Sequence, residues 1–273
     1  MTDSAPPFFT RYGFSRTGDS ETPLIIQPYP EIGEAGVLRA TIIASAIDLV
    51  GGLLTREIAG VDALMTSDLS LRIPHPEMPA RLLVQAERIR TGRKLVTTGT
   101  RIQTDLGESG AATDFAYGET TFVRVPRAPE DAPPLEALQT PAIIESHPLQ
   151  QPLASEVGIQ TRVDSPGRVE LALRPALLNP EGIMQGALVA LLIECAALDL
   201  AGRTQEPAAA ARFAVSGLDL RFLSSASVGP VLGKASWIGQ PEARMIRVEL
   251  RDHGRENRLT ASALVNVLAL PES

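Results

Sequence analysis

Two segments of the chain resemble each other, and this internal repeat sets the expected architecture. Residues 36–52, GVLRATIIASAIDLVGG, align with residues 182–198, GIMQGALVALLIECAAL, at an offset of 146. Asp48 aligns with Glu194 at the same offset. Each segment is a long apolar run with one acid near its middle, which predicts a helix covered on most sides. A repeat of this kind predicts two structurally similar halves.

Strand patterns follow each predicted helix in the same order. The blocks SDLSLRI and SGLDLRF have the period of two that is typical of strands. The segments with strand character are 67–73, 82–103, 116–125, 168–173, 216–222, 231–252 and 260–270. An antiparallel sheet that curls around its own helix would cover the helix. The sequence therefore predicts an α+β fold with two copies of a long central helix wrapped by a curled antiparallel β-sheet.

Seven prolines lie between residues 126 and 152. Proline removes a backbone donor and fixes φ, so this stretch is a poor candidate for a helix or a central strand. We therefore expect a Pro-rich linker over residues 126–152. It would separate an N-terminal domain, residues 1–125, from a C-terminal domain, residues 153–273.

Charge and composition exclude several function classes. The formal net charge of −7 argues against general nucleic-acid binding, which needs a basic field. The single cysteine, Cys195, excludes an intramolecular disulfide and any site with several cysteine ligands. The three histidines, His75, His147 and His253, are scattered, so we expect no metal site. The sequence also contains no Gly-x-Ser-x-Gly motif and no Gly-rich phosphate loop.

The ends and the apolar runs predict a cytoplasmic protein. The N-terminal residues MTDSAPPFFT lack the basic start and apolar core of a secretory signal. The longest apolar run, residues 186–202, contains two acids and is shorter than the ~20 residues of a membrane span. We expect no membrane segment.

An acid inside an apolar helix and a glycine at a helix start together predict a site with a general base and an oxyanion donor. Gly186 stands where the second apolar run begins, so its N–H would be one of the unpaired donors at a helix N-terminus. Such a donor can polarise a carbonyl or stabilise an oxyanion. Burial would raise the pKa of Asp48 or Glu194, as suits a general base. The alternative for either acid is a structural role, bonded to a helix terminus or an arginine of the other half.

The pattern Asn179–x2–Gly182–x2–Gln185–Gly186–x7–Glu194 resembles the motif of hotdog-fold acyl-CoA thioesterases. The most similar families are the phenylacetate-pathway and 4-hydroxybenzoyl-CoA thioesterases. The resemblance covers most of both halves and implies a tandem, or double, hotdog. It also implies an acyl-CoA (acyl thioester) hydrolase that needs no metal and no cofactor beyond coenzyme A as part of its substrate. An acyl-carrier thioester is the alternative substrate.

In this family one subunit supplies the helix N–H and asparagine, and its partner supplies the acid. Carried over, the resemblance implies two pseudo-equivalent sites between the halves. In the first, the Gly186 N–H holds the thioester oxygen, Asp48 activates water or attacks directly, and Ser67 orients the acid or the water. Asn179 and Gln185 complete this site.

The second implied site combines Glu194 and Ser216 with the loop at Gly36, Arg39 and Ala40. This loop departs from the motif, because Gly33 replaces the asparagine and Ala40 the glycine. We therefore expect the first site to be the more active one.

The first site departs from the family pattern as well. Gln185 stands where the family has histidine, and Ala187 stands where it has its second glycine. The strand that often carries a basic residue for coenzyme A reads SSAS at residues 224–227, without charge. Arginines and lysines elsewhere could meet phosphates, and an acyl-carrier substrate would require a local basic patch on this acidic chain.

Two other functions remain open at this point. A non-catalytic acyl or small-ligand binding protein is favoured by the degenerate first loop and by Gln185. A hotdog acyl-thioester dehydratase or hydratase would need His75 or His253 beside Asp48 or Glu194. From the habit of the fold we also expect a homodimer or a higher homo-oligomer.

Overall fold

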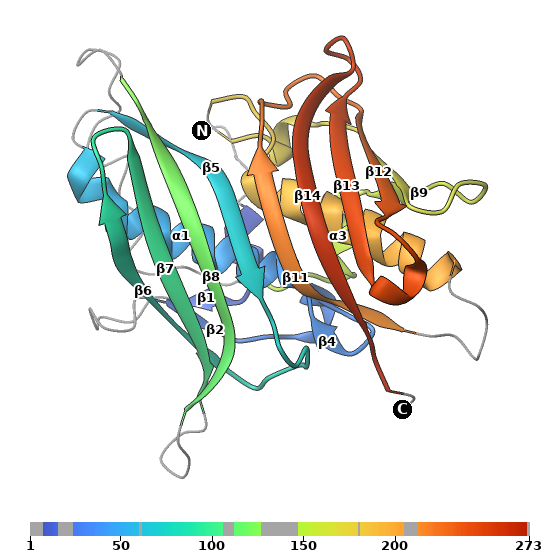
Figure 1. Ribbon diagram of the computed structural model, residues 1–273, viewed down its shortest axis with the longest axis horizontal. Helices are drawn as coiled ribbons and strands as arrows, with labels where there is room; N and C mark the ends of the chain where they lie inside the picture. The colour runs from blue at the N-terminus through green and yellow to red at the C-terminus, as the bar shows by residue number, and fades with distance from the viewer. Residues whose placement is uncertain are drawn as a thin grey trace.

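The computed structural model describes residues 8–15, 24–59, 62–105, 112–126, 147–179, 181–204 and 212–271. Within them, one sheet of twelve strands dominates the fold (Figure 1). Most of the predicted Pro-rich linker, residues 127–146, lies outside the described residues.

The two long helices and the strands that follow each of them occur in the predicted order, and further short elements precede each helix. The first region contains η1 (Phe8–Arg11), β1 (Phe14–Ser15), β2 (Leu24–Ile26), η2 (Pro30–Ile32), β3 (Gly33–Glu34), β4 (Val37–Leu38), α1 (Ala40–Ala59), β5 (Ala63–Arg72), β6 (Leu82–Thr91), β7 (Leu95–Thr104) and β8 (Thr113–Val125). The second region contains α2 (Leu153–Val157), β9 (Gln160–Thr161), β10 (Arg168–Leu171), η6 (Pro175–Leu177), α3 (Gly186–Thr204), β11 (Phe213–Phe222), β12 (Val231–Trp237), η7 (Pro241–Ala243), β13 (Met245–Asp252) and β14 (Arg258–Ala269).

The strand order shows how the two regions meet. It runs β1-β2-β6-β7-β8-β5-β11-β14-β13-β12-β10-β9, with antiparallel pairing throughout. The first strand after each long helix, β5 or β11, therefore lies at the centre of the sheet. These two strands pair with each other, and two ion pairs of 2.9 Å, Arg72–Asp219 and Arg221–Asp68, connect them.

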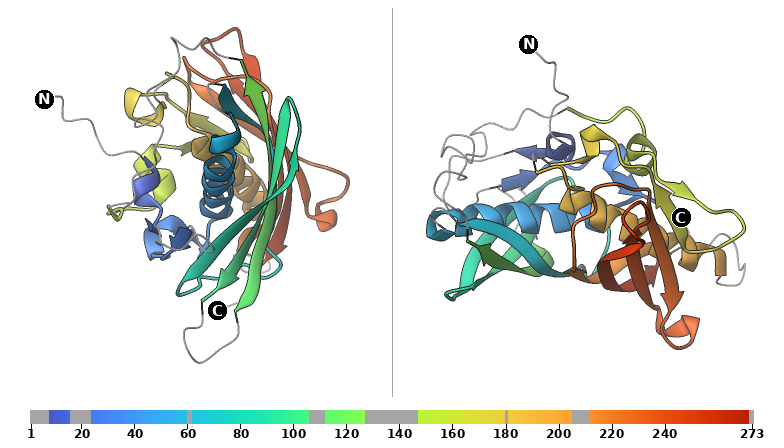
Figure 2. Two further views of the ribbon diagram at one scale, coloured as in Figure 1. Left: turned by 90° about the vertical axis from the view of Figure 1, so that its left-hand side faces the viewer. Right: turned by 90° about the horizontal axis from the view of Figure 1, so that it is seen from above.

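Both long helices lie on the same side of the sheet (Figure 2). Their apolar side chains pack against the inward-facing residues of the strands, so burial of apolar surface positions them. The short elements η1, η2 and α2 lie across the helices on the side away from the sheet. In the part of the chain that the structure describes, no helix is long and apolar enough to span a membrane.

One glycine allows α1 to approach the sheet closely. A Cβ at Gly51 would lie 2.6 Å from Thr98 Oγ1 and 3.1 Å from the ring of Phe122. The helix therefore keeps a helix-weakening residue where any side chain would push it away from β7 and β8. This close packing fixes the position of Asp48, one turn earlier on the same helix.

Candidate active site

The structure confirms that α3 begins at Gly186, at the point where the apolar run begins. The preceding loop is held by Asn179, whose Oδ1 accepts hydrogen bonds from the backbone N–H groups of Glu181 and Ile183 at 3.0 and 3.1 Å. The Gln185 side chain points back toward this loop and donates to the carbonyls of Ala176 and Leu178. Both side chains therefore shape the approach to α3.

The backbone N–H of Gly186 has no hydrogen-bond partner among the described residues. It lies in the first turn of α3, where N–H groups have no partner within the helix and the helix dipole favours negative charge. The N-terminus of α3 is therefore open to an external oxygen.

Asp48 lies opposite this terminus on α1. Its Oδ1 accepts a hydrogen bond of 2.6 Å from the hydroxyl of Thr66 on β5. Burial raises the pKa of Asp48 above its ordinary value, and the Thr66 hydrogen bond opposes this by stabilising the carboxylate. Ionising Asp48 therefore costs free energy, and its carboxylate accepts a proton more readily than that of an ordinary aspartate.

A small cavity separates Asp48 from the start of α3. It is lined by Ala44, Ser45, Asp48, Leu69, Gly186, Ala187, Ala190, Leu220 and Phe222. Its volume is about 10 Å³, which is close to the space for one water molecule. A methyl group on Gly186 would lie 3.9 Å from Asp48 Oδ2 and 3.8 Å from the Phe222 ring, so glycine keeps this space open.

The second acid, Glu194, is placed differently. It is 4% exposed and its carboxylate accepts from the Ala40 N–H at 3.0 Å, the Thr41 N–H at 3.0 Å and the Thr41 hydroxyl at 2.7 Å. These donors are the first residues of α1, so Glu194 fills the N-terminus of the other helix. This geometry matches the structural role that the sequence left open for one of the acids.

The surroundings of Glu194 are closed and cationic. Arg39, 3% exposed, contacts Glu34 and lies 3.9 Å from Cys195 Sγ. Burial raises the pKa of the Cys195 thiol to about 12, so the thiol is protonated and unreactive at neutral pH. The two acids are therefore arranged unequally: one fills its helix terminus, and the other faces an open one.

The structure corrects the predicted role of Ser67. Its hydroxyl donates to Asp68 Oδ2 and to the carbonyl of Thr121, and the hydroxyl that reaches Asp48 belongs to the preceding residue, Thr66. The reason is a bulge in β5 between Thr66 and Asp68, which turns Thr66 inward. Ser216 lies at the corresponding bulge in β11 and donates to the Asn266 carbonyl, away from Glu194.

The histidines that a dehydratase would use lie elsewhere. His75 and His253 are exposed, and neither lines the cavity beside Asp48. No group of three or more metal-ligating side chains occurs within the described ranges.

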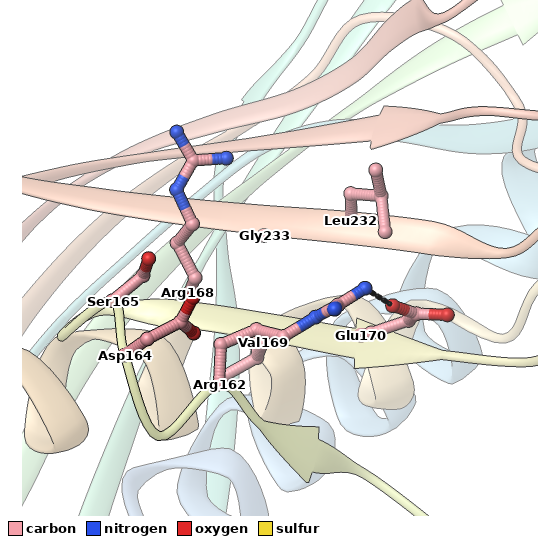
Figure 3. A pocket seen from close by; sticks show the side chains of 8 residues that line it. All are labelled: Arg162, Asp164, Ser165, Arg168, Val169, Glu170, Leu232 and Gly233. Atoms are coloured by element: carbon pink, nitrogen blue, oxygen red, sulfur yellow. Dashed lines mark hydrogen bonds and ion pairs between the residues drawn. The ribbon is translucent and has the colours of Figure 1, made fainter.

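A larger hollow of about 270 Å³ lies beside β9, β10 and β12 (Figure 3). Its arginine Arg162 bonds to Glu170 at 2.6 Å, while Arg168 extends away from that pair. Arg203, in the last turn of α3, donates to the Arg162 carbonyl, so this hollow lies about 26 Å along α3 from Gly186. It is too distant to share a reaction with Asp48.

Comparison with known proteins identifies the fold. An acyl-ACP thioesterase from Bacteroides thetaiotaomicron aligns with a TM-score of 0.59 and 12% identity, over 89% of this chain and 96% of its own. A protein of unknown function with a hot dog fold from Alicyclobacillus acidocaldarius aligns with a TM-score of 0.55 and 13% identity, over 98% and 100% of the two chains. This chain has the hotdog fold.

A third structure, a 12:0-ACP thioesterase from Umbellularia californica, aligns with a TM-score of 0.55 and 9% identity, over 90% of this chain and 96% of its own. No family model matches the sequence, and no curated protein matches it. At these identities the likeness extends to the fold, and the function has to be argued from the site.

Proposed function

We propose that this chain hydrolyses acyl thioesters at the cavity between Asp48 and Gly186. One observation carries the proposal: a partly buried carboxylate with a raised pKa faces an open helix N-terminus across a space for one water. These are a general base and an oxyanion donor on opposite sides of a position where a reacting atom can lie. The named structural neighbours include thioesterases, which supports this reaction class.

The reaction follows from this placement. A water that enters the cavity gives a proton to Asp48, and its oxygen attacks the thioester carbon. The carbonyl oxygen gains negative charge and accepts from the Gly186 N–H, which the dipole of α3 strengthens. The carbon–sulfur bond then breaks, the thiolate takes the proton from Asp48, and the products are a carboxylic acid and a thiol. Thr66 keeps the Asp48 carboxylate oriented through its hydrogen bond.

The proposal includes a tandem of two hotdog domains, residues 1–125 and 153–273. Its support is the equivalent order of strands on the two sides of the β5–β11 pair, with one long helix against each side. In this arrangement Asp48 comes from one domain and Gly186 from the other. Of the two pseudo-equivalent sites, the one with Glu194 is filled by its own acid, so the Asp48 site does the chemistry. A homodimer and a cytoplasmic location remain predictions.

The test measures thiol release from short, medium, long and aromatic acyl-CoAs. Asp48→Asn is expected to lower kcat/KM by about 100-fold or more, the usual contribution of a general base. Asp114→Asn, the same change at an exposed aspartate on β8, is the matched control and should leave the rate unchanged. Glu194→Gln should lower the melting temperature, while the enzyme that remains folded should keep its turnover. A folded Asp48→Asn variant with wild-type turnover would refute the proposal.

A further inference from the structure

The hairpin between β6 and β7 is strongly basic in an acidic chain. Its cations, Arg88, Arg90, Arg93 and Lys94, are all exposed. None of their side chains has an ion-pair or hydrogen-bond partner in the part of the chain that the structure describes. We call residues 88–95 the basic hairpin. Its unpaired charge is available to an external anion, while the chain as a whole carries a net charge of −7.

The strand register places the basic hairpin level with Asp48. Thr66, which bonds Asp48, pairs with Phe122 on β8, which pairs with Val96 on β7, which pairs with Thr91 on β6. Thr91 is the last residue before the turn of the hairpin. Three strand spacings therefore separate the hairpin from Thr66, about 14 Å across the sheet. Figure 1 shows the β6–β7 turn at the same end of the sheet as the start of β5.

Apolar side chains continue from the basic hairpin along the outer face of the sheet. Met65, Val123 and Leu95 form one cross-strand row there, and Met65 and Leu95 are 41% and 48% exposed. Ile89, at a bulge in β6, is 50% exposed. A flat surface with apolar residues beside unpaired charges is typical of a protein–protein contact, whereas nucleotides bind in hollows. None of the cavities described above is lined by the four cations.

The corresponding turn of the second region lacks this charge. The segment between β12 and β13, residues 238–244, contains one acid, Glu242, and one cation, Arg244. In the tandem arrangement this turn accompanies the site that Glu194 fills. Of these two corresponding turns, only the one in the region that carries Asp48 has a cluster of exposed cations without ion pairs among the described residues.

We propose that the basic hairpin docks a small acidic protein that carries the acyl group as a thioester on a flexible arm. This inference rests on the proposed function. The acidic partner is attracted to four exposed cations on a chain whose net charge is −7. The arm of a partner docked there would have to cross the three strand spacings, about 14 Å, that separate the hairpin from Thr66.

The experiment compares one acyl group on three carriers: octanoyl-acyl carrier protein, octanoyl-CoA and the neutral octanoyl-N-acetylcysteamine. The test variant changes Arg88, Arg90, Arg93 and Lys94 to Gln. The matched control removes the same charge from the outer face of the second region, by changing Arg162, Arg168, Arg247 and Lys234 to Gln. The test variant should lose at least about tenfold in kcat/KM on the carrier protein and less than about twofold on octanoyl-N-acetylcysteamine. The control should lose less than about threefold on each substrate.

Other outcomes would overturn the proposal. Equal losses on the carrier protein and on octanoyl-CoA would assign the hairpin to phosphate binding. If the test variant no longer sedimented with phosphatidylglycerol vesicles but kept its kcat/KM on the carrier protein, the hairpin would be assigned to a membrane surface. If the wild type turns over none of the three substrates, the proposed function fails. The docking is then judged separately from the affinity of octanoyl-acyl carrier protein for the wild type and the test variant, which should differ by at least about tenfold.

Discussion

Lengthening Asp48 by one methylene should convert the open site into a copy of the closed one. In Asp48→Glu the carboxylate reaches about 1.5 Å further, into a cavity of about 10 Å³ whose far side is Gly186. There it can accept from the first N–H groups of α3, as Glu194 accepts from Ala40 and Thr41 on α1. A hydrogen bond to a charged group contributes about 1.5–3 kcal/mol, and the lost Thr66 hydrogen bond offsets part of it.

We therefore expect Asp48→Glu to stabilise the fold by about 1–2 kcal/mol and to raise the melting temperature by about 2–6 °C. The same change displaces the water and blocks the oxyanion donor, so kcat/KM should fall at least about 100-fold. Thermal unfolding and thiol-release assays on the same preparation check both numbers. The reverse control, Glu194→Asp, should destabilise the fold and leave the Asp48 site working. An Asp48→Glu enzyme that is within tenfold of wild-type activity, or that melts lower, would refute the reasoning.

The remaining predictions concern the same cavity. Thr66→Val removes the hydrogen bond that lowers the pKa of Asp48, so the rising limb of the kcat/KM–pH profile should move to higher pH; an unmoved limb would show that Asp48 is not the titrating base. Gly186→Ala adds a methyl group at ordinary contact distances, so the fold should survive while activity falls at least about tenfold, and full activity would place the reacting water elsewhere. Asp48→Asn should raise stability near neutral pH, because a buried acid with a raised pKa destabilises the fold once pH exceeds its unfolded value; the gain should disappear at acidic pH, and a gain that persists there would contradict this origin. Dialysis against a chelator should leave thiol release unchanged, and a loss restored by a divalent metal would overturn the metal-free mechanism.

The internal repeat was sufficient to predict the two long helices, the strands that follow each of them and the start of α3, because all depend on apolar periodicity. The short elements β1, β2, β9 and α2 were not predicted. Gly186 marks the helix start since the apolar run begins there, and the two acids stand out because a charge in such a run is costly. The identity of the hydroxyl beside Asp48 could not be predicted in this way. A bulge shifts the alternation of β5 by one residue, so the hydroxyl that reaches Asp48 belongs to Thr66, whereas the family resemblance implied Ser67. The one signal was the threonine immediately before the matched serine.

The unequal acids also could not be assigned from their matched positions alone. The alignment treats Asp48 and Glu194 as equivalents, but one methylene decides whether a carboxylate reaches the opposite helix. Thr41 adds a hydroxyl for Glu194, whereas its counterpart Ala187 adds none for Asp48. Conversely, Thr66 supports Asp48, and its counterpart Val215 has no donor to offer Glu194.

These paired differences point in one direction. At the start of α1, the Ala40 and Thr41 N–H groups already donate to Glu194. These donors are therefore not available to a substrate. Asp48 keeps one protein donor on one oxygen, while a space of about 10 Å³ separates the carboxylate from the start of α3. A fold selected for stability alone would fill that space with the longer acid, which the chain already uses at the other terminus. The shorter acid keeps a partly buried charge, which is unfavourable, opposite the unpaired Gly186 N–H. These are the two groups that water-mediated attack on a carbonyl requires.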